Sequence, residues 1–162
     1  MSFLVLYSEE YEEIKNILMN LKQETNSRVA LIVEKNGQPI AFAGEMDGVD
    51  TTSLGSLVAG NVAATEGLAK MLGEKSFPLM FNEGSRENLH ITPIGDRFIL
   101  AVLFDKRTSL GLVRLRAKNA ALKLERVFSR LEEKMKREKE KLGDEENPLE
   151  DLSEEDIDKL FK

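Results

Sequence analysis

The chain has 162 residues, of which 23 are basic and 29 acidic, so its formal net charge is −6. Residues 144–162 hold nine acidic residues and two lysines, a net charge of −7, whereas residues 1–143 hold 21 basic and 20 acidic residues, a net charge of +1. A chain of 162 residues is expected to form one domain with a further terminal segment. The domain therefore lacks the basic excess that binds nucleic acid or anionic lipid.

Two absences narrow the class of protein further. The sequence has no cysteine, which excludes disulfides, thiol catalysis and cysteine metal sites and is compatible with a reducing cytoplasm. The N-terminus lacks the basic region of a signal peptide, and the longest apolar run, Phe98–Phe104, is far shorter than the ~20 residues of a membrane helix. We therefore expect a cytoplasmic protein without a membrane-inserted segment.

Hydrophobic periodicity and turn signals predict three long helices and five strands in the order α-β-β-α-β-β-β-α. The predicted helices cover residues 8–25, 51–73 and 109–131. The predicted strands cover residues 29–33, 39–43, 77–82, 88–93 and 97–104. All strand connections but one are hairpin-length, so the sheet should be antiparallel. Helices on both of its faces then give a three-layer α/β sandwich.

Local signals define several of these elements. Ser8 is the expected N-cap of the first helix, and Asn36-Gly37 is the strongest short hairpin signal. The pair Asp50-Thr51 offers N-caps for the second helix, and Gly73 suits the position just after its end. Phe98–Phe104 has no polar alternation, so both of its faces should be buried, which predicts the central strand.

The C-terminal part of the chain differs from the domain. Residues 132–142 are almost all charged with both signs mixed, which predicts a solvated extension of the third helix, and residues 143–147 are interpreted as a linker. A short helix beginning at Ser153 is expected to become ordered only by docking. The sequence leaves three alternatives for this helix: it binds in a groove of a partner protein, it is a frayed terminus, or it folds back on its own domain. Its apolar residues and the preceding leucines are Leu149, Leu152, Ile157, Leu160 and Phe161.

The second helix carries the main functional signal. On a helical wheel one arc is expected to cover the sheet. Its members are Leu54, Val58, Val62, Thr65, Leu68, Ala69 and Leu72. The opposite arc, where a surface helix normally carries charged residues, consists of small residues and one lysine. Its members are Thr52, Ser56, Ala59, Gly60, Ala63, Ala64, Gly67 and Lys70.

Three glycines inside this helix, Gly55, Gly60 and Gly67, each cost about 1 kcal/mol relative to alanine. Close approach of another element would offset that cost, because Ser56, Gly60, Ala63 and Gly67 form a smooth stripe. The approaching element is another chain or a third element of the same chain. We expect contact with another chain.

No set of residues with catalytic spacing can be named. His90 is the only histidine and has no nearby ligand partner, so we expect a structural role and no metal site. Nothing in the spacing of the arginines selects an arginine finger. The candidates are Arg28, Arg86, Arg107, Arg114 and Arg116. Neither phosphate-binding glycine motif, G-x-x-x-x-G-K-[ST] or G-x-G-x-x-G, occurs, so we expect no nucleotide or other cofactor, and an autonomous enzyme is disfavoured.

Several segments resemble the Roadblock family, and within it the regulators of bacterial Ras-like GTPases. These segments are Leu4–Tyr7, Val33–Gln38, Asp50–Leu54, Leu57–Ala64, Phe104–Arg116 and Asp156–Phe161. The resemblance covers about residues 3–131 and 149–161, and the charged residues 132–147 lie outside it. It implies a Roadblock domain over 1–131, a charged helix extension and linker over 132–148, and a docking helix over 149–162.

The resemblance also implies an architecture and partners. The five-stranded antiparallel sheet should carry one helix on one face and two on the other. A homodimer is implied in which the second helices pair antiparallel and edge strands join the two sheets, with one Ras-like small GTPase bound per dimer. The implied GTPase-binding or dimer-interface residues are Thr52, Ser56, Ala59, Gly60, Ala63, Ala64 and Gly67. The implied docking residues of the terminal helix are Leu152, Ile157, Leu160 and Phe161.

The function implied by the resemblance is GTPase activation without catalytic residues of its own. Such regulators remodel the GTPase switch regions without inserting an arginine finger, and their terminal helix affects nucleotide exchange. A cytoplasmic location near a cell pole and roles in polarity and gliding motility are implied with it. Two alternatives remain: a non-catalytic scaffold built from the same dimer, and a ligand-sensing domain, which would need a cavity.

Overall fold

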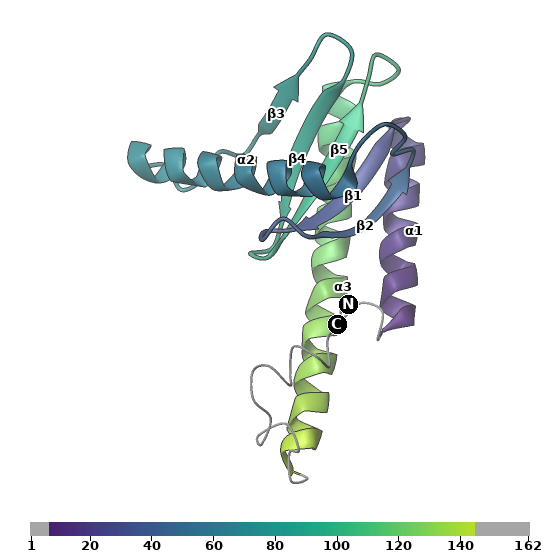
Figure 1. Cartoon of the computed structure of the whole chain (residues 1–162), viewed down its shortest axis with the longest axis vertical. Helices are drawn as coiled ribbons and strands as arrows, with labels where there is room; N and C mark the ends of the chain where they lie inside the picture. Colours follow the sequence, from purple (N-terminus) through teal and green to yellow (C-terminus); the bar gives the residue numbers. More distant parts are fainter. Residues whose placement is uncertain (1–6, 145–162) are drawn as a thin grey trace.

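The computed structural model describes residues 7–144, which form three layers. A five-stranded sheet lies between α2 (Thr51–Leu72) on one face and the pair α1 (Ser8–Thr25) and α3 (Leu110–Asp144) on the other (Figure 1). This arrangement confirms the predicted antiparallel α/β sandwich with one helix on one face and two on the other. None of the helices in the described part of the chain is both long and apolar enough to span a membrane.

The sheet is antiparallel throughout, with the strands in the order β2-β1-β5-β4-β3. The strands are β1 (Val29–Glu34), β2 (Pro39–Gly44), β3 (Met80–Glu83), β4 (Asn88–Ile94) and β5 (Phe98–Phe104). Ala101 on β5 lies opposite Leu31 on one side and Ile91 on the other, which fixes the register of the three central strands. The strand without polar alternation is therefore central, as predicted.

The alternation of side chains along the strands divides the core into two clusters. One cluster packs against α1 and α3, whose apolar stripes include Leu18, Val113 and Leu124. Its strand residues include Ala30, Ile32, Leu100, Val102 and Phe104. The other cluster packs against α2. Its strand residues include Val29, Leu31, Val33, Ile99 and Ala101.

Polar contacts bind the start of α1 and the preceding Tyr7 to the C-terminal part of α3. The buried carboxylate of Glu10 accepts a hydrogen bond from Lys134 Nζ. That hydrogen bond is the main reason why the pKa of Glu10 lies below its usual value. The hydroxyl of Tyr7 donates to Glu138 Oε2 at 2.7 Å. The charged extension of α3 is thus partly held by α1, although its other residues are solvated.

One predicted helix cap and one predicted strand boundary were wrong. Helix α1 begins at Ser8, and Tyr7 occupies the N-cap position without a side-chain hydrogen bond, so Ser8 is not the cap. Strand β3 begins at Met80 and not at residue 77. The reason is local, because Pro78 has no backbone N–H with which to pair. The caps predicted for α2, Asp50 and Gly73, are confirmed.

The long helix ends later than the sequence indicated. Helix α3 continues through Gly143 to Asp144, where a linker was expected to begin. The lysines and glutamates that precede Gly143 are strong helix formers, so the helix continues through the glycine. The rest of the predicted linker and the predicted terminal docking helix lie outside the described residues.

Candidate protein-interaction surface

Helix α2 packs its N-terminal half against β1 and β2, and its C-terminal half projects beyond the strands (Figure 1). Its start is fixed by Asp50, whose carboxylate accepts a hydrogen bond from the Thr52 amide at 3.1 Å. Its end is fixed by Gly73 in the left-handed conformation, with φ 73°. The residues buried in this helix are Gly55, Val58, Ala59, Val62 and Ala69. Because the sheet supports only part of α2, much of the helix lies in water.

Six of the seven contact residues predicted on α2 share an exposed face. They are Thr52, Ser56, Gly60, Ala63, Ala64 and Gly67. Ala59 does not belong with them, because it is only 8% exposed and packs in the core beside Val58 and Val62. Buried residues at spacing i, i+3, i+4 and i+7 from Gly55 define the sheet-facing side of α2, and Ala59 falls on that side.

The three glycines of α2 have different surroundings. A Cβ on Gly55 would lie 2.6 Å from the Gly37 carbonyl oxygen, so Gly55 permits the close approach of helix and hairpin. A Cβ on Gly60 or on Gly67 would meet no described atom within 4 Å. The described part of the chain therefore explains the first glycine but not the other two.

Sequence reasoning missed the large apolar residues of the same face. Leu57, Leu68 and Met71 are 73%, 55% and 85% exposed. Leu68 and Leu72 were expected to cover the sheet, and that expectation is wrong, because both side chains are exposed. The strands do not extend beneath the end of the helix. The signal that could have found this face is the spacing of Leu57, Ala64, Leu68 and Met71, which places them together on the side of the helix opposite Gly55.

We call the six exposed small residues together with Leu57, Leu68 and Met71 the α2 surface. It continues into a groove of about 580 Å³ beneath the projecting end of the helix. The groove is lined by residues that include Val62, Thr65, Lys70, Phe77, Met80 and Pro93. On the adjoining sheet face, Met80, Leu89 and Leu103 are only partly buried. Exposed apolar surface of this kind makes α2 a candidate site for contact with another protein.

The two edges of the sheet are protected to different degrees. On β2, Pro39 begins the strand, a bulge interrupts its pairing with β1, and Lys15 Nζ donates to the Phe42 carbonyl. These features discourage pairing with another strand. On β3 the outer edge of Met80–Glu83 has no partner strand among the described residues, and it lies beside the groove. The open edge of β3 and the α2 surface therefore meet at this groove.

The ionisable groups described in residues 7–144 lie in structural contacts. His90 is buried, with Nδ1 3.2 Å from the Thr92 hydroxyl, and burial, followed by the charge of Arg114, lowers its pKa. Three of the five candidate arginines form ion pairs. These pairs are Arg28–Glu87, Arg107–Asp105 and Arg116–Glu24. Within residues 7–144 no group of three or more histidine, aspartate or glutamate side chains is placed to hold a metal ion.

Comparison with known proteins agrees with this geometry. Residues 13–104 match the family described as Roadblock/LC7 domain. The structure is similar to Myxococcus xanthus MglB, with 50% sequence identity and a TM-score of 0.71 over 75% of this chain and 98% of that chain. The gliding protein MglB of Thermus thermophilus is 34% identical, with a TM-score of 0.67 over 74% of this chain and 90% of that chain. A further MglB structure, described as a tetrameric arrangement, is 32% identical, with a TM-score of 0.70 over 76% of this chain and 93% of that chain.

Proposed function

The chain belongs to the Roadblock/LC7 family, and we propose that it is a homodimeric GTPase-activating protein for a Ras-like small GTPase of the MglA type. The observation that carries the proposal is the α2 surface, where small residues and exposed Leu57, Leu68 and Met71 lie together. The 50% identity to Myxococcus xanthus MglB over three quarters of the chain supports it.

Self-association uses the α2 surface and the open edge of β3 in this proposal. Antiparallel pairing of two α2 helices would cover Leu68 and Met71, and Gly60 and Gly67 would allow the two backbones to approach closely. Pairing of two β3 strands would satisfy the backbone groups of the open edge. The protected edge at β2 supports the assignment of β3 to this role. One GTPase would then bind across the dimer.

Activation needs no catalytic residue from this chain. A regulator that binds the hydrolysis-competent conformation of the GTPase switch regions more tightly than the inactive one shifts the population toward it. The GTPase's own residues then act on the nucleotide, and no arginine finger is inserted. The part of the α2 surface that the paired helices leave exposed would contact the switch regions. Its small and apolar residues support this mode, because packing against the switch regions can select their conformation without a catalytic side chain from this chain.

Turnover of GTP by a candidate GTPase, with and without this protein, tests the proposal. The variant Gly67→Arg places a long cation on the α2 surface, and we expect it to weaken the complex by about 3 kcal/mol, roughly a hundredfold. Gly111→Arg is the matched control, because Gly111 is also an exposed helical glycine with no atom near its Cβ position, but lies on α3. If Gly67→Arg stimulates hydrolysis as well as the native protein does, the assignment is wrong.

The C-terminal residues form a second part of the proposal. We propose that the segment 149–162, with Leu152, Ile157, Leu160 and Phe161, docks on the GTPase away from the α2 surface and promotes nucleotide exchange. Its amphipathic pattern supports this role. Deletion of residues 149–162 should slow exchange and weaken binding. Unchanged affinity together with unchanged exchange would contradict this part alone.

A scaffold that holds proteins together without affecting hydrolysis would use the same surfaces. The hydrolysis assay separates the two functions, because a scaffold forms the complex and leaves the turnover of GTP unaltered. A cytoplasmic location near a cell pole and roles in polarity and gliding motility belong to the same proposal.

A further inference from the structure

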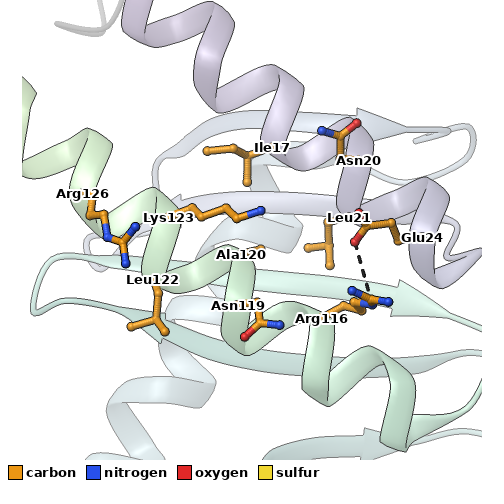
Figure 2. Close-up of a pocket in the computed structure, with 10 residues that line it drawn as sticks. All are labelled: Ile17, Asn20, Leu21, Glu24, Arg116, Asn119, Ala120, Leu122, Lys123 and Arg126. Atoms are coloured by element: carbon orange, nitrogen blue, oxygen red, sulfur yellow. Dashed lines mark ion pairs between the residues drawn. The ribbon is translucent and has the colours of Figure 1, made fainter.

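A second groove lies on the opposite face of the molecule, between α1 and α3. Its volume is about 290 Å³, which is below the range of most small-molecule pockets and suits protruding side chains. Figure 2 shows that both helices contribute to it, with Ile17 and Leu21 from α1 and Leu122 from α3. Leu21 is buried, whereas Leu122 is 50% exposed. We call this feature the α1–α3 groove.

The charge around the α1–α3 groove is strongly basic. Arg116, Lys123 and Arg126 line it together with a single carboxylate, that of Glu24. Glu24 Oε2 lies 4.0 Å from Arg116 Nε, and Figure 2 draws this ion pair as a dashed line. Among residues 7–144 no acidic group pairs with Lys123 or Arg126.

The basic character extends along this part of α3. Residues 114–126 contain five basic residues and one acidic residue, a net charge of +4. Leu115, on the same helix, is 56% exposed. The half-exposed side chain of Leu122, next to the cations Lys123 and Arg126, which are unpaired among the described residues, suits an amphipathic helix that is acidic on its flanks.

We propose that the α1–α3 groove binds the acidic C-terminal segment of this same chain, residues 145–162. That segment holds eight acidic residues and two lysines, a net charge of −6, opposite in sign to residues 114–126. Its apolar residues Ile157, Leu160 and Phe161 fall at i, i+3 and i+4, so on a helix they form one compact face. The groove supplies the complementary apolar floor and basic rim.

The length of the segment matches the position of the groove. At about 1.5 Å per residue, Leu122 lies roughly 33 Å along α3 from Asp144. Residues 145–152 in extended conformation span roughly 26 Å, and a helix over 153–161 adds about 13 Å. A segment that turns back along α3 therefore brings this helix to the level of residues about 118–127. Those residues include Leu122, Lys123 and Arg126.

This inference does not depend on the proposed function. It assigns a binding site within the chain for a segment that could otherwise contact a partner, whether or not that partner is a GTPase. The α1–α3 groove and the α2 surface lie on opposite sides of the sheet (Figure 1), so occupation of one does not cover the other.

The absence of cysteine allows a direct test in the full chain. A nitroxide spin label attached to Lys159→Cys in isotope-labelled protein should selectively reduce the amide signals of α1 and α3 around Leu21 and Leu122. The reduction should disappear in about 1 M salt, where the Debye length is about 3 Å. Groove signals that are unaffected by the label would overturn the proposal.

Charge reversal separates specific docking from general attraction. The double variant Lys123→Glu/Arg126→Glu should restore the signals, and both side chains are exposed, so the fold is retained. The matched control Lys75→Glu/Lys106→Glu changes the net charge equally at exposed positions outside the groove and should leave the reduction intact. Mixing spin-labelled chains with isotope-labelled chains that carry no label should produce no reduction. A reduction there would show that a second copy supplies the segment and would overturn the proposal.

Discussion

Substitution of alanine at each of the three α2 glycines should have effects of opposite sign on stability. At Gly60 and Gly67 the new methyl group enters open space, so alanine only removes the helix penalty of glycine. At Gly55 the methyl group would lie 2.6 Å from the Gly37 carbonyl oxygen and 3.1 Å from Pro39 Cγ. The same glycine-to-alanine substitution should therefore raise or lower the free energy of unfolding according to what surrounds the position on the helix.

The magnitudes follow from the two environments. In a helix interior, replacing glycine with alanine contributes about 0.5–1 kcal/mol to the free energy of unfolding. Gly55→Ala gains the same amount but loses about 1–3 kcal/mol through overpacking. The contact is with backbone, and Gly37 has φ 95° within a tight turn closed by its N–H to the Glu34 carbonyl, so it cannot move cheaply. Because both variants gain the same helix term, the free energies of unfolding of Gly55→Ala and Gly60→Ala should differ by the overpacking loss alone, about 1–3 kcal/mol.

Urea unfolding followed by far-ultraviolet circular dichroism measures these differences, because helix dominates the signal and the chain lacks tryptophan. The urea midpoint should be measured at low and high protein concentration, because association makes the midpoint depend on concentration whereas the stability of the protomer does not. The penalty at Gly55 should be independent of concentration. If Gly55→Ala is as stable as Gly60→Ala, the close approach of helix and hairpin is not the reason for the glycine.

Two further predictions concern buried ionisable groups. Because the pKa of His90 is lowered in the folded state, the unfolded chain binds more protons below about pH 6.5, and the free energy of unfolding should fall there. His90→Gln should flatten this slope in urea midpoints measured at about pH 7.5 and 5.5. Lys134→Met should cost about 1–3 kcal/mol near neutral pH, because it leaves the buried Glu10 carboxylate without its hydrogen-bonded cation. Equal stability of the Lys134→Met and native proteins in urea would refute that role.

Most of the fold could be predicted because its signals are local. The exact bounds of α1 and the caps of α2 follow from apolar periodicity, Asp50 and Gly73. The central position of β5 follows from its unbroken apolar run. The errors lie where two local signals compete. Pro78 delays β3 within an apolar segment, and the strong helix formers before Gly143 carry the helix past a residue that usually ends one.

The candidate site was only partly predictable, because a helical wheel does not reveal how much of a helix the sheet supports. Every apolar residue near the sheet-facing arc was assigned to the core, including Leu68, although the strands end before it. Ala59 was placed outward because it falls at the edge of the outward arc of the helical wheel, whereas that edge adjoins Gly55 and is buried where the helix closely approaches the hairpin. Exposure of Met71 depends on where the helix ends relative to the sheet, which is a property of the tertiary structure.

Docking of the acidic segment in the α1–α3 groove would set the affinity of this chain for any partner that binds the same segment. A partner captures only the fraction of chains in which the segment is released, so its apparent dissociation constant rises by the inverse of that fraction. Because the docked state relies on uncompensated cations such as Lys123 and Arg126, this fraction should increase with ionic strength. Salt therefore has two opposite effects on binding of the partner. It weakens the electrostatic attraction between the segment and the partner, but it also releases the segment from the α1–α3 groove. The variant Lys123→Glu/Arg126→Glu isolates the second effect, since it releases the segment at low salt without altering the segment itself.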